Sequence, residues 1–403
     1  MKLQVFKFLR LTNPKSCIIC VCFLMAAIAW GSVFYGHSVY LTALTEDGRW
    51  SIGQISTGIT IFWISSLPGT LFVGYLIDKK GASWVVFIGA CCVGFSLVGI
   101  SWAHDLWLIF VCYGIMGFAY PAVGAAAISA TLSPWFFKDF GWALGLSLTG
   151  ASVGGAIIPP VMMYTIQKIS FPLTMIFAGG IVFFVLCILA FILALTKPAT
   201  VQSVTPVQSK NLIAVNLLKK KVFWRIAIAA GMALAGQVGF LAHQIPVALQ
   251  QTSEFASVIS VTIVAISAAI GRLITAYASR IYGVTKIATF CYAFQGLGIL
   301  IVSFAETTAL LWFGCSVAGL VVGAIVMLSP MLVREAFGSM DYGKNYAAVN
   351  VILYSFAAVS PWFLGNMFDH HQSYAAGLMT LFSVQIVAAV LILPNVNSAE
   401  VSP

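Results

Sequence analysis

The sequence predicts an all-α membrane protein in which twelve transmembrane helices form two pseudo-symmetric bundles of six helices each. Three observations carry this prediction: the composition, the spacing of the apolar stretches and an internal repeat. The 403 residues are 61% hydrophobic and only 8% charged, with a mean hydropathy of +1.01, whereas a soluble chain carries about 25% charged residues. So few charges do not cover a water-facing surface, which excludes soluble enzymes, nucleic-acid-binding proteins and secreted disulfide scaffolds.

Apolar stretches of bilayer length follow one another along the chain. In the first half they cover residues 17–44, 52–77, 82–103, 106–133, 140–166 and 172–196. In the second half they cover residues 223–250, 255–279, 286–305, 308–333, 345–368 and 374–394. The first stretch contains Ala27-Ile28-Ala29, which resembles a signal-peptidase site, but it continues through Leu44 and is too long for a cleaved signal. We therefore interpret it as the first transmembrane helix.

A polar interval separates the two sets of six spans. We expect residues 1–196 to form an N-terminal bundle, residues 197–222 a cytoplasmic linker and residues 223–403 a C-terminal bundle. The first part of the linker is rich in Pro, Ser, Thr and Gln, as flexible connections are. The second part ends in Lys219-Lys220-Lys221 and is either a short basic helix on the inner leaflet or an irregular loop.

The distribution of Lys and Arg predicts the orientation in the membrane. Seventeen of these cations lie at the termini or in the even-numbered gaps between spans, and only Arg49 and Lys168 lie in the odd-numbered gaps. Because such an excess marks the cytoplasmic side, we expect both termini in the cytoplasm and a multi-pass protein of the cell inner (cytoplasmic) membrane, surrounded by lipid. The net charge of +9 is then a signal of topology and does not indicate a nucleic-acid partner.

The sequence gives no indication of catalysis. All nine cysteines fall inside apolar stretches, and the metal-like spacing of Cys17 and Cys20 has no second ligand pair. The chain contains neither an HExxH motif nor a complete phosphate-binding Gly-x-x-x-x-Gly-Lys-Ser/Thr motif. We therefore expect no enzyme, no cofactor and no resident metal, and we interpret the glycine clusters as sites of helix packing.

A shift of 202 residues aligns parts of the two halves without gaps. The matched pairs are Gly69 with Gly271, Leu71 with Leu273, Tyr75 with Tyr277, Gly81 with Gly283, Gly117 with Gly319 and Pro159 with Pro361. They lie in the second, fourth and fifth spans of each half. An internal duplication, which is common in transporters, explains this register.

The loop after the second span contains a recognisable motif made of Gly74, Asp78, Lys79 and Gly81. Together with the six-plus-six spans, this stretch resembles the loop motif of the major facilitator superfamily. Gly74 would allow two helices to approach closely, and Asp78 would cap or pair with a neighbouring helix end. These contacts would hold the inner gate shut. The second-half copy has Arg280 in place of the aspartate, and an ordinary charged cytoplasmic turn is the alternative interpretation.

Two further stretches, residues 135–154 and 50–56, resemble the monocarboxylate transporter and oxalate/formate exchanger branch of that superfamily. The resemblance implies alternating-access transport of a small organic monocarboxylate, with protons as co-substrate and a monomeric carrier. Drug/proton antiporters have an arginine where this chain has Tyr113, and Gly-Pro-x-x-Gly-Gly where it has residues 150–155. An efflux or uptake carrier for a larger amphipathic solute remains the alternative function.

One charged residue, Arg272, lies well inside a predicted span. Its insertion costs about 2.5–3.5 kcal/mol, and no Asp or Glu lies within any predicted span. A guanidinium binds a carboxylate through two parallel hydrogen bonds, and the resembled branch places an arginine in this helix as a carboxylate ligand. The other interpretations are that Arg272 reaches the inner interface or binds helix carbonyls. Residues 345–368, where oxalate exchangers place a lysine, contain no Lys or Arg, which favours a monoanion.

His37 in the first span and His243 in the seventh are candidates for carrying the proton, because histidine titrates near neutral pH. Counted back from Trp50, His37 occupies the position of a lysine in animal monocarboxylate carriers. A buried histidine is also commonly a hydrogen-bonded packing residue, and both interpretations stay open. The candidates for neutral hydrogen bonds to the substrate are Tyr35, Gln237, Gln295, Asn350 and Tyr354.

Overall fold

The computed structural model describes residues 14–46, 48–136, 139–196, 215–338 and 342–393, and within these ranges every regular element is helical. In the first half the spans are Pro14–Thr45, Ile52–Lys80 (α4), Ala82–Ser101 (α5), Leu106–Leu132, Phe140–Lys168 (α8) and Phe171–Leu195 (α9). In the second half they are Lys221–Gln251 (α11), Glu254–Tyr282 (α12), Val284–Ser303 (α13), Thr308–Phe337 (α14), Asn345–His371 within α15 (Tyr342–His371) and Ala375–Ile392 (α16). The predicted all-α fold with twelve membrane-length helices is confirmed.

The first span is not one regular helix. It consists of α2 (Pro14–Ala29), the π-helical turn η1 (Trp30–Phe34) and α3 (Gly36–Thr45). The amide of Tyr35 donates to the carbonyl of Trp30 at 2.9 Å, which is the five-residue spacing of a π-helix. Such turns widen a helix locally and are frequent at functional sites.

The fourth span is also interrupted, and here the cause is visible in the sequence. It consists of α6 (Leu106–Ala119), the 3₁₀ turn η2 (Tyr120–Ala122) and α7 (Ala125–Leu132). Pro121 lacks an amide hydrogen and therefore cannot donate the backbone hydrogen bond that would continue α6. The carbonyl of Tyr120 instead accepts hydrogen bonds from the amides of Val123 and Gly124, at 3.1 and 2.9 Å.

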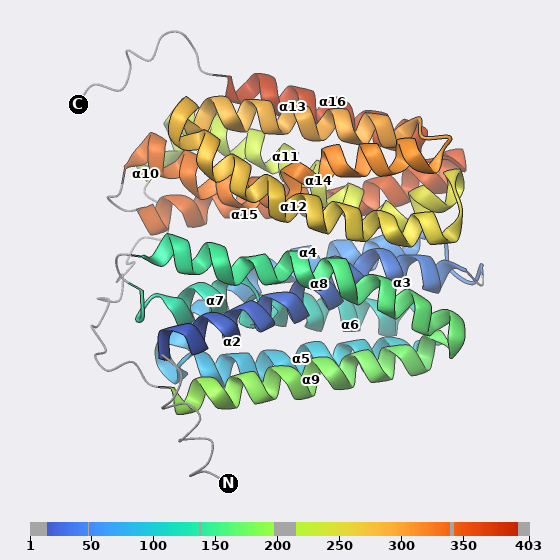
Figure 1. The fold of residues 1–403 in the computed structure, drawn as a ribbon, viewed down its shortest axis with the longest axis horizontal. Helices are drawn as coiled ribbons and strands as arrows, with labels where there is room; N and C mark the ends of the chain where they lie inside the picture. Colours follow the sequence, from blue (N-terminus) through green and yellow to red (C-terminus); the bar gives the residue numbers. More distant parts are fainter. Residues whose placement is uncertain (1–13, 47, 137–138, 197–214, 339–341, 394–403) are drawn as a thin grey trace. The chain divides into compact units, whose positions relative to one another are not determined.

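The chain divides into two compact units. Unit 1 comprises Met1–Trp50 and Ile61–Gln208, and unit 2 comprises Ser51–Thr60 and Ser209–Pro403. The first turns of α4 therefore pack with unit 2, although the rest of that helix belongs to unit 1. Within unit 1, α5 runs beside α9, and within unit 2, α13 runs beside α16 (Figure 1). The predicted linker falls mostly on residues 197–214, outside the described residues, and α10 (Val215–Leu218) is its one helical turn in the described part.

The two units repeat the same close contacts at the 202-residue shift. A methyl group added at Gly69 of α4 would collide with the carbonyl of Phe118, and one added at Gly271 of α12 would collide with the carbonyl of Leu320. Phe118 and Leu320 are themselves 202 residues apart. Two more contact pairs follow the shift: Gly117 with Phe62 and Gly319 with Val264, then Gly94 with Phe183 and Gly296 with Gln385. These paired contacts support the predicted duplication.

Gly81 and Gly283 show the repeat in the backbone itself. They join α4 to α5 and α12 to α13, with φ angles of +84° and +86°. Only glycine adopts this left-handed region without a steric penalty, which gives a physical reason for a glycine at both positions.

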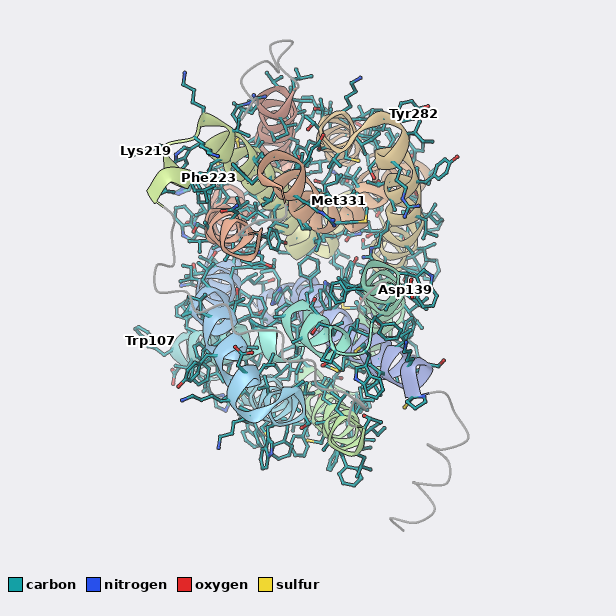
Figure 2. All side chains as sticks on the ribbon, turned by 90° about the vertical axis from the view of Figure 1, so that its left-hand side faces the viewer. Trp107, Asp139, Lys219, Phe223, Tyr282 and Met331 are labelled. Carbon is teal, nitrogen blue, oxygen red and sulfur yellow. The ribbon has the colours of Figure 1, made fainter. Side chains whose placement is uncertain are left out.

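The outer surfaces of both units are apolar. In unit 1, Trp107 at the start of α6 is 78% exposed and points away from its helix (Figure 2). Phe184 of α9 and Phe290 of α13 are similarly exposed along their helices. Contiguous exposed apolar side chains of this kind are expected where lipid is the solvent.

Candidate functional site

Arg272 lies deep in α12, ten residues before the C-terminal Tyr282, or about 15 Å along the helix axis. Its side chain is half-buried, and its Nε donates to the carbonyl oxygen of Gly323 in α14 at 3.4 Å. A methyl group at Gly323 would collide with the carbonyl of Ala268 and approach Cβ of Arg272 to 3.2 Å. The missing side chain at position 323 therefore makes room for the arginine between α12 and α14.

One of the alternatives for Arg272 is realised in part, because it does bind a helix carbonyl. A carbonyl oxygen is a neutral acceptor and does not neutralise the guanidinium charge. The acidic residues within the twelve described spans lie only in a first or last turn: Asp78, Glu254, Glu335 and Asp369.

The predicted neutral ligands fall in different units. Gln237 of α11 is 1% exposed, and its Oε1 has no hydrogen-bond donor among the described residues. Asn350 and Tyr354 are half-buried on α15, in the same unit as Arg272. Tyr35 lies in unit 1, where its ring occupies the space above Gly155 of α8.

Unit 2 contains a buried pair of side-chain amides that was not predicted from the sequence. Gln385 of α16 donates through Nε2 to Oε1 of Gln295 at 2.7 Å and to the carbonyl of Ala233 at 3.0 Å. Both glutamines are fully buried, and the missing side chain of Gly236 admits the Gln385 amide. Gln295, predicted as a substrate ligand, uses its oxygen to join α13 to α16. The sequence contained one signal for this pair, because Gln385 is a second glutamine within an apolar span.

His37 is buried in an aromatic environment of unit 1. Its ring meets Phe62 of α4 edge-on, with 4.7 Å between centroids, and lies 5.7 Å from the ring of Tyr113 in α6. Neither His37 Nε2 nor the Tyr113 hydroxyl has a hydrogen-bond partner in the described part of the chain. The 202-residue shift carries Phe62 to Val264 and Tyr113 to Cys315, so this environment is a property of unit 1 alone.

An aromatic cluster adjoins this histidine through Phe62 and joins the two irregular spans. Its members are Trp30, Phe34, Phe62, Trp63 and Tyr120, with neighbouring ring centroids 5.3–5.9 Å apart. Trp30 comes from η1 and Tyr120 from η2. The irregular turns thus direct large rings into the interior of unit 1.

His243, the second proton candidate, is held by three contacts within unit 2. Its Nε2 lies 3.0 Å from the carbonyl of Pro361 and 3.2 Å from Oγ of Ser56, and its Nδ1 lies 3.1 Å from the hydroxyl of Tyr374. Because the carbonyl only accepts, Nε2 carries the hydrogen, and in the neutral ring Nδ1 accepts from Tyr374. The neutral imidazole is satisfied on both sides, which is the arrangement of a packing residue.

The predicted gate motif lies at the C-terminal end of α4. Asp78 and Lys79 are exposed there, Lys79 Nζ lies 4.5 Å from the Tyr75 ring centroid, and within the described ranges no ion pair of Asp78 is formed. The structure differs from expectation at Gly74, because an added methyl group would meet no atom within 4 Å. The close helix approach occurs at Gly69 instead. Lys138 and Lys197, counted on the same side, lie outside the described residues.

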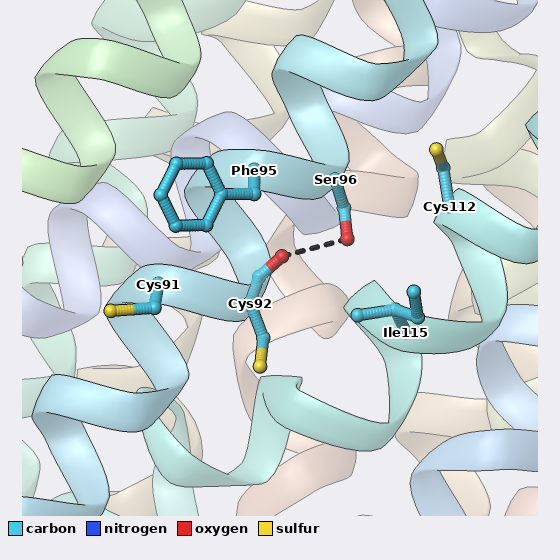
Figure 3. Close-up of a pocket in the computed structure, with 6 residues that line it drawn as sticks. All are labelled: Cys91, Cys92, Phe95, Ser96, Cys112 and Ile115. Atoms are coloured by element: carbon cyan, nitrogen blue, oxygen red, sulfur yellow. Dashed lines mark hydrogen bonds between the residues drawn. The ribbon is translucent and has the colours of Figure 1, made fainter.

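The structure has two grooves of about 250 Å³ each, and no predicted site residue is among the residues that line them. One, in unit 1, is lined by Cys91, Cys92, Phe95, Ser96, Cys112 and Ile115 (Figure 3). Ser96 Oγ donates to the carbonyl of Cys92 at 2.7 Å, which leaves thiols and apolar groups as the lining. The other lies between α12, α13 and α14. The described residues contain no group of three or more His, Cys, Asp or Glu suited to a metal ion.

A family model and several similar proteins indicate the same family for this chain. The family model of the Major Facilitator Superfamily matches residues 19–361. The chain is 26% identical to the MFS transporter asaE of Aspergillus flavus over 74% of this chain and 68% of that protein. It is 22% identical to the uncharacterized MFS-type transporter YhjX of Escherichia coli over 81% of each. The Fujikurins efflux protein of Gibberella fujikuroi is 30% identical, but over only 28% of this chain and 25% of that protein.

Solved structures show the same fold at low sequence identity. A mutant of the nucleoside transporter NupG has a TM-score of 0.79 and 15% identity, covering 94% of this chain and 99% of that one. A bacterial homologue of the human lysosomal transporter Spinster has a TM-score of 0.71 and 13% identity, covering 94% and 96%.

Proposed function

The chain belongs to the Major Facilitator Superfamily, and on this premise we propose that it moves a small organic monocarboxylate across the membrane by alternating access, together with a proton. The observation that carries the proposal is Arg272, a cationic side chain placed deep in α12. An intramembrane charge is expensive and usually marks a substrate or ion site. We also propose a monomer in the cytoplasmic membrane, with both termini in the cytoplasm.

The chemistry of Arg272 selects the class of substrate. Its planar guanidinium matches the two oxygens of a carboxylate, and in a water-poor environment the paired charge offsets the cost of burial. Residues 345–368 of α15 contain no second cation, which favours one carboxylate over two. Gln237, Asn350 and Tyr354 in unit 2, and Tyr35 in unit 1, are the proposed neutral ligands.

His37 supports the proton-coupled form of the proposal. It is a buried titratable group whose Nε2 is not committed to another described residue, whereas both nitrogens of His243 are engaged in the neutral state. We therefore place the transported proton on His37 first and on His243 second. Gly74, Asp78, Lys79 and Gly81 at the end of α4 are proposed to gate the inner side.

Transport into proteoliposomes tests this function. Purified protein preloaded with unlabelled substrate should exchange labelled monocarboxylates, while the matching amides, which lack the charge, and dicarboxylates of equal length should exchange poorly. An inward proton gradient should drive accumulation. Equal exchange of an acid and its amide would contradict the proposal.

A second candidate function is efflux or uptake of a larger amphipathic solute. The aromatic cluster of unit 1 favours it, because buried rings bind planar apolar groups well, and the Fujikurins efflux protein is a partial relative. The same proteoliposomes separate the candidates. An uncharged apolar solute that inhibits exchange as well as any carboxylate would favour this second function.

A further inference from the structure

A polar seam joins the start of α4 to the end of α15 within unit 2. Oδ2 of Asp369 accepts a hydrogen bond from Oγ of Ser51 at 2.6 Å and from the amide of Gly53 at 3.0 Å. The first amides of a helix have no partner within the helix, and a carboxylate is stabilised there by the helix dipole. Asp369 therefore supplies to α4 an acceptor that comes from 316 residues later in the chain.

Ser51 is oriented toward Asp369 by its own helix. The backbone amide of Gln54 donates to Ser51 Oγ at 3.2 Å, and the side-chain Oε1 of Gln54 accepts from the backbone amide of Ser51 at 2.9 Å. These two bonds together form a capping box. Because Ser51 Oγ already accepts one bond, its hydrogen is available to the carboxylate. The contact with Asp369 is therefore aligned by the sequence of α4.

Two more contacts extend the seam along both helices. A methyl group at Gly365 would lie 2.6 Å from Ser56 Oγ and 2.8 Å from Cα of Gly53, so the two backbones nearly touch. Further along, Thr60 Oγ1 donates to the carbonyl of Ala358 at 2.7 Å. Small residues with hydrogen bonds between helices are the means by which helices associate in lipid.

The segment after Asp369 is anchored to α11. The amide of Tyr374 donates to Oε1 of Gln250 at 3.3 Å, and the Tyr374 hydroxyl contacts His243. Burial, and second the negative charge of Asp369, raise the pKa of Tyr374 well above its usual value. Tyr374 therefore keeps its hydrogen and donates it to the neutral ring of His243. These contacts tie the segment that follows Asp369 to α11.

We propose that Asp369 is a gating residue of the outer face, which caps α4 in the state seen here and releases it when the transporter opens outward. The proposal rests on the proposed alternating-access function. Among the described helices, α4 is the one whose residues are shared between the two units, so its first turns are placed to change partners. Ser51 is exposed and Asp369 half-buried, so water can replace their hydrogen bonds at small net cost. By contrast, water cannot take the place of the close-packed contact between Gly271 and the backbone of Leu320.

The test follows the accessibility of the seam from outside. Ser56 is fully buried, and Ser56→Cys preserves its size, so labelling by an impermeant maleimide reports opening. Mass spectrometry of the peptide containing position 56 leaves the native cysteines in place. We expect Asp369→Asn to label about ten-fold faster than the parent, the equivalent of one lost charge-assisted bond. Asp369→Glu should label more slowly than Asp369→Asn.

Asp105→Asn is the matched control. Asp105 occupies the N-cap of α6 on the same predicted side, and its side chain makes no capping hydrogen bond. The Asp105→Asn variant should be labelled at position 56 at the same rate as the parent. A lower melting temperature in Asp369→Asn with unchanged labelling would show a merely structural cap and overturn the proposal.

A second variant covers the case in which Asp369→Asn does not fold. The double variant Ser51→Cys/Asp369→Cys should form a disulfide on oxidation. The disulfide should block labelling at position 56, and reduction should restore the labelling. An equal labelling rate with and without the disulfide overturns the proposal. Because labelling needs no substrate, the two failures are distinguishable. If the Asp369 variants change labelling at position 56 but the protein does not exchange carboxylates, the proposed substrate is refuted and the gate is not. If the protein exchanges carboxylates but the Asp369 variants leave labelling unchanged, the gate is refuted.

Discussion

At the scale of single residues, the two buried histidines differ in whether their ring nitrogens have hydrogen-bond partners among the described residues. His243 donates to a carbonyl and accepts from Tyr374, so a second proton would leave the tyrosine hydrogen without its present acceptor. His37 has aromatic rings on two sides and an unused Nε2. Because Nε2 of His37 has no hydrogen-bond partner among the described residues, His37 is the histidine to which the proposed function assigns the proton.

The first prediction concerns coupling. His37→Gln should lose proton-driven accumulation while it retains exchange of labelled carboxylate, because the amide fills the space but carries no transferable charge. His243→Gln is the control and should lower the melting temperature while coupling persists, because it breaks a packing contact. Accumulation in proteoliposomes with and without a proton gradient checks both variants. Unchanged accumulation in His37→Gln would place the proton elsewhere.

At the scale of the element, α4 contains two glycines with different surroundings. Gly69 lies against the carbonyl of Phe118, whereas Gly74 faces open space, although both stand in the same helix. The sequence pattern treated them alike as small residues suited to helix contact. Only the neighbouring helix distinguishes them.

The second prediction follows from this difference. Gly69→Ala should destabilise the protein by about 1–3 kcal/mol, as overpacking does, and Gly271→Ala should match it because its contact is the repeat of the first. Gly74→Ala should change the melting temperature little. The measurement is thermal unfolding of the purified variants in detergent. Equal destabilisation at positions 69 and 74 would mean that the α4–α6 contact is misplaced.

Some elements were predictable from sequence and others were not. Hydropathy located all twelve spans, because length and apolarity are local properties of the chain. The π turn at Trp30 has no signal of that kind, because it lies inside a continuous apolar stretch. The break at Tyr120 was signalled by Pro121 but hidden within a continuous apolar stretch. The Asp369 cap was out of reach, because its two partners are separated by more than 300 residues and no local pattern joins them.

The site was less predictable than the fold for a related reason. Arg272 and His37 stood out because a charge or a titratable ring is rare in an apolar span. Gln385 did not stand out, because an amide is compatible with many environments until its partner is known. Gly81 was identified through a motif, and its φ of +84° gives the physical cause.

At the scale of the whole molecule, a duplicated frame carries different side chains in its two halves. The glycine contacts repeat at 202 residues, while the aromatic surroundings of His37 become Val264 and Cys315. Conversely, Arg272 corresponds to Thr70 in the first half. The two halves therefore share the frame of helix contacts, whereas Arg272 and the aromatic surroundings of His37 are each found in one half only.

The third prediction concerns orientation. The cation count predicts that positions 79 and 197 face the cytoplasm and that position 306, in an odd-numbered gap, faces outward. Single cysteines introduced at these positions into a cysteine-free protein should react with an impermeant reagent on intact cells only at position 306. Labelling of positions 79 and 197 from outside would invert the topology.

The central claim is that Arg272 binds the carboxylate of the substrate, and ligand-induced thermal stabilisation tests it most directly. The parent protein, Arg272→Lys and Arg272→Ala are heated with a panel of monocarboxylates. The account predicts clear stabilisation of the parent, weak stabilisation of Arg272→Lys, which keeps the charge without the planar fork, and none of Arg272→Ala. Equal stabilisation of the parent and Arg272→Ala by the best carboxylate would contradict it.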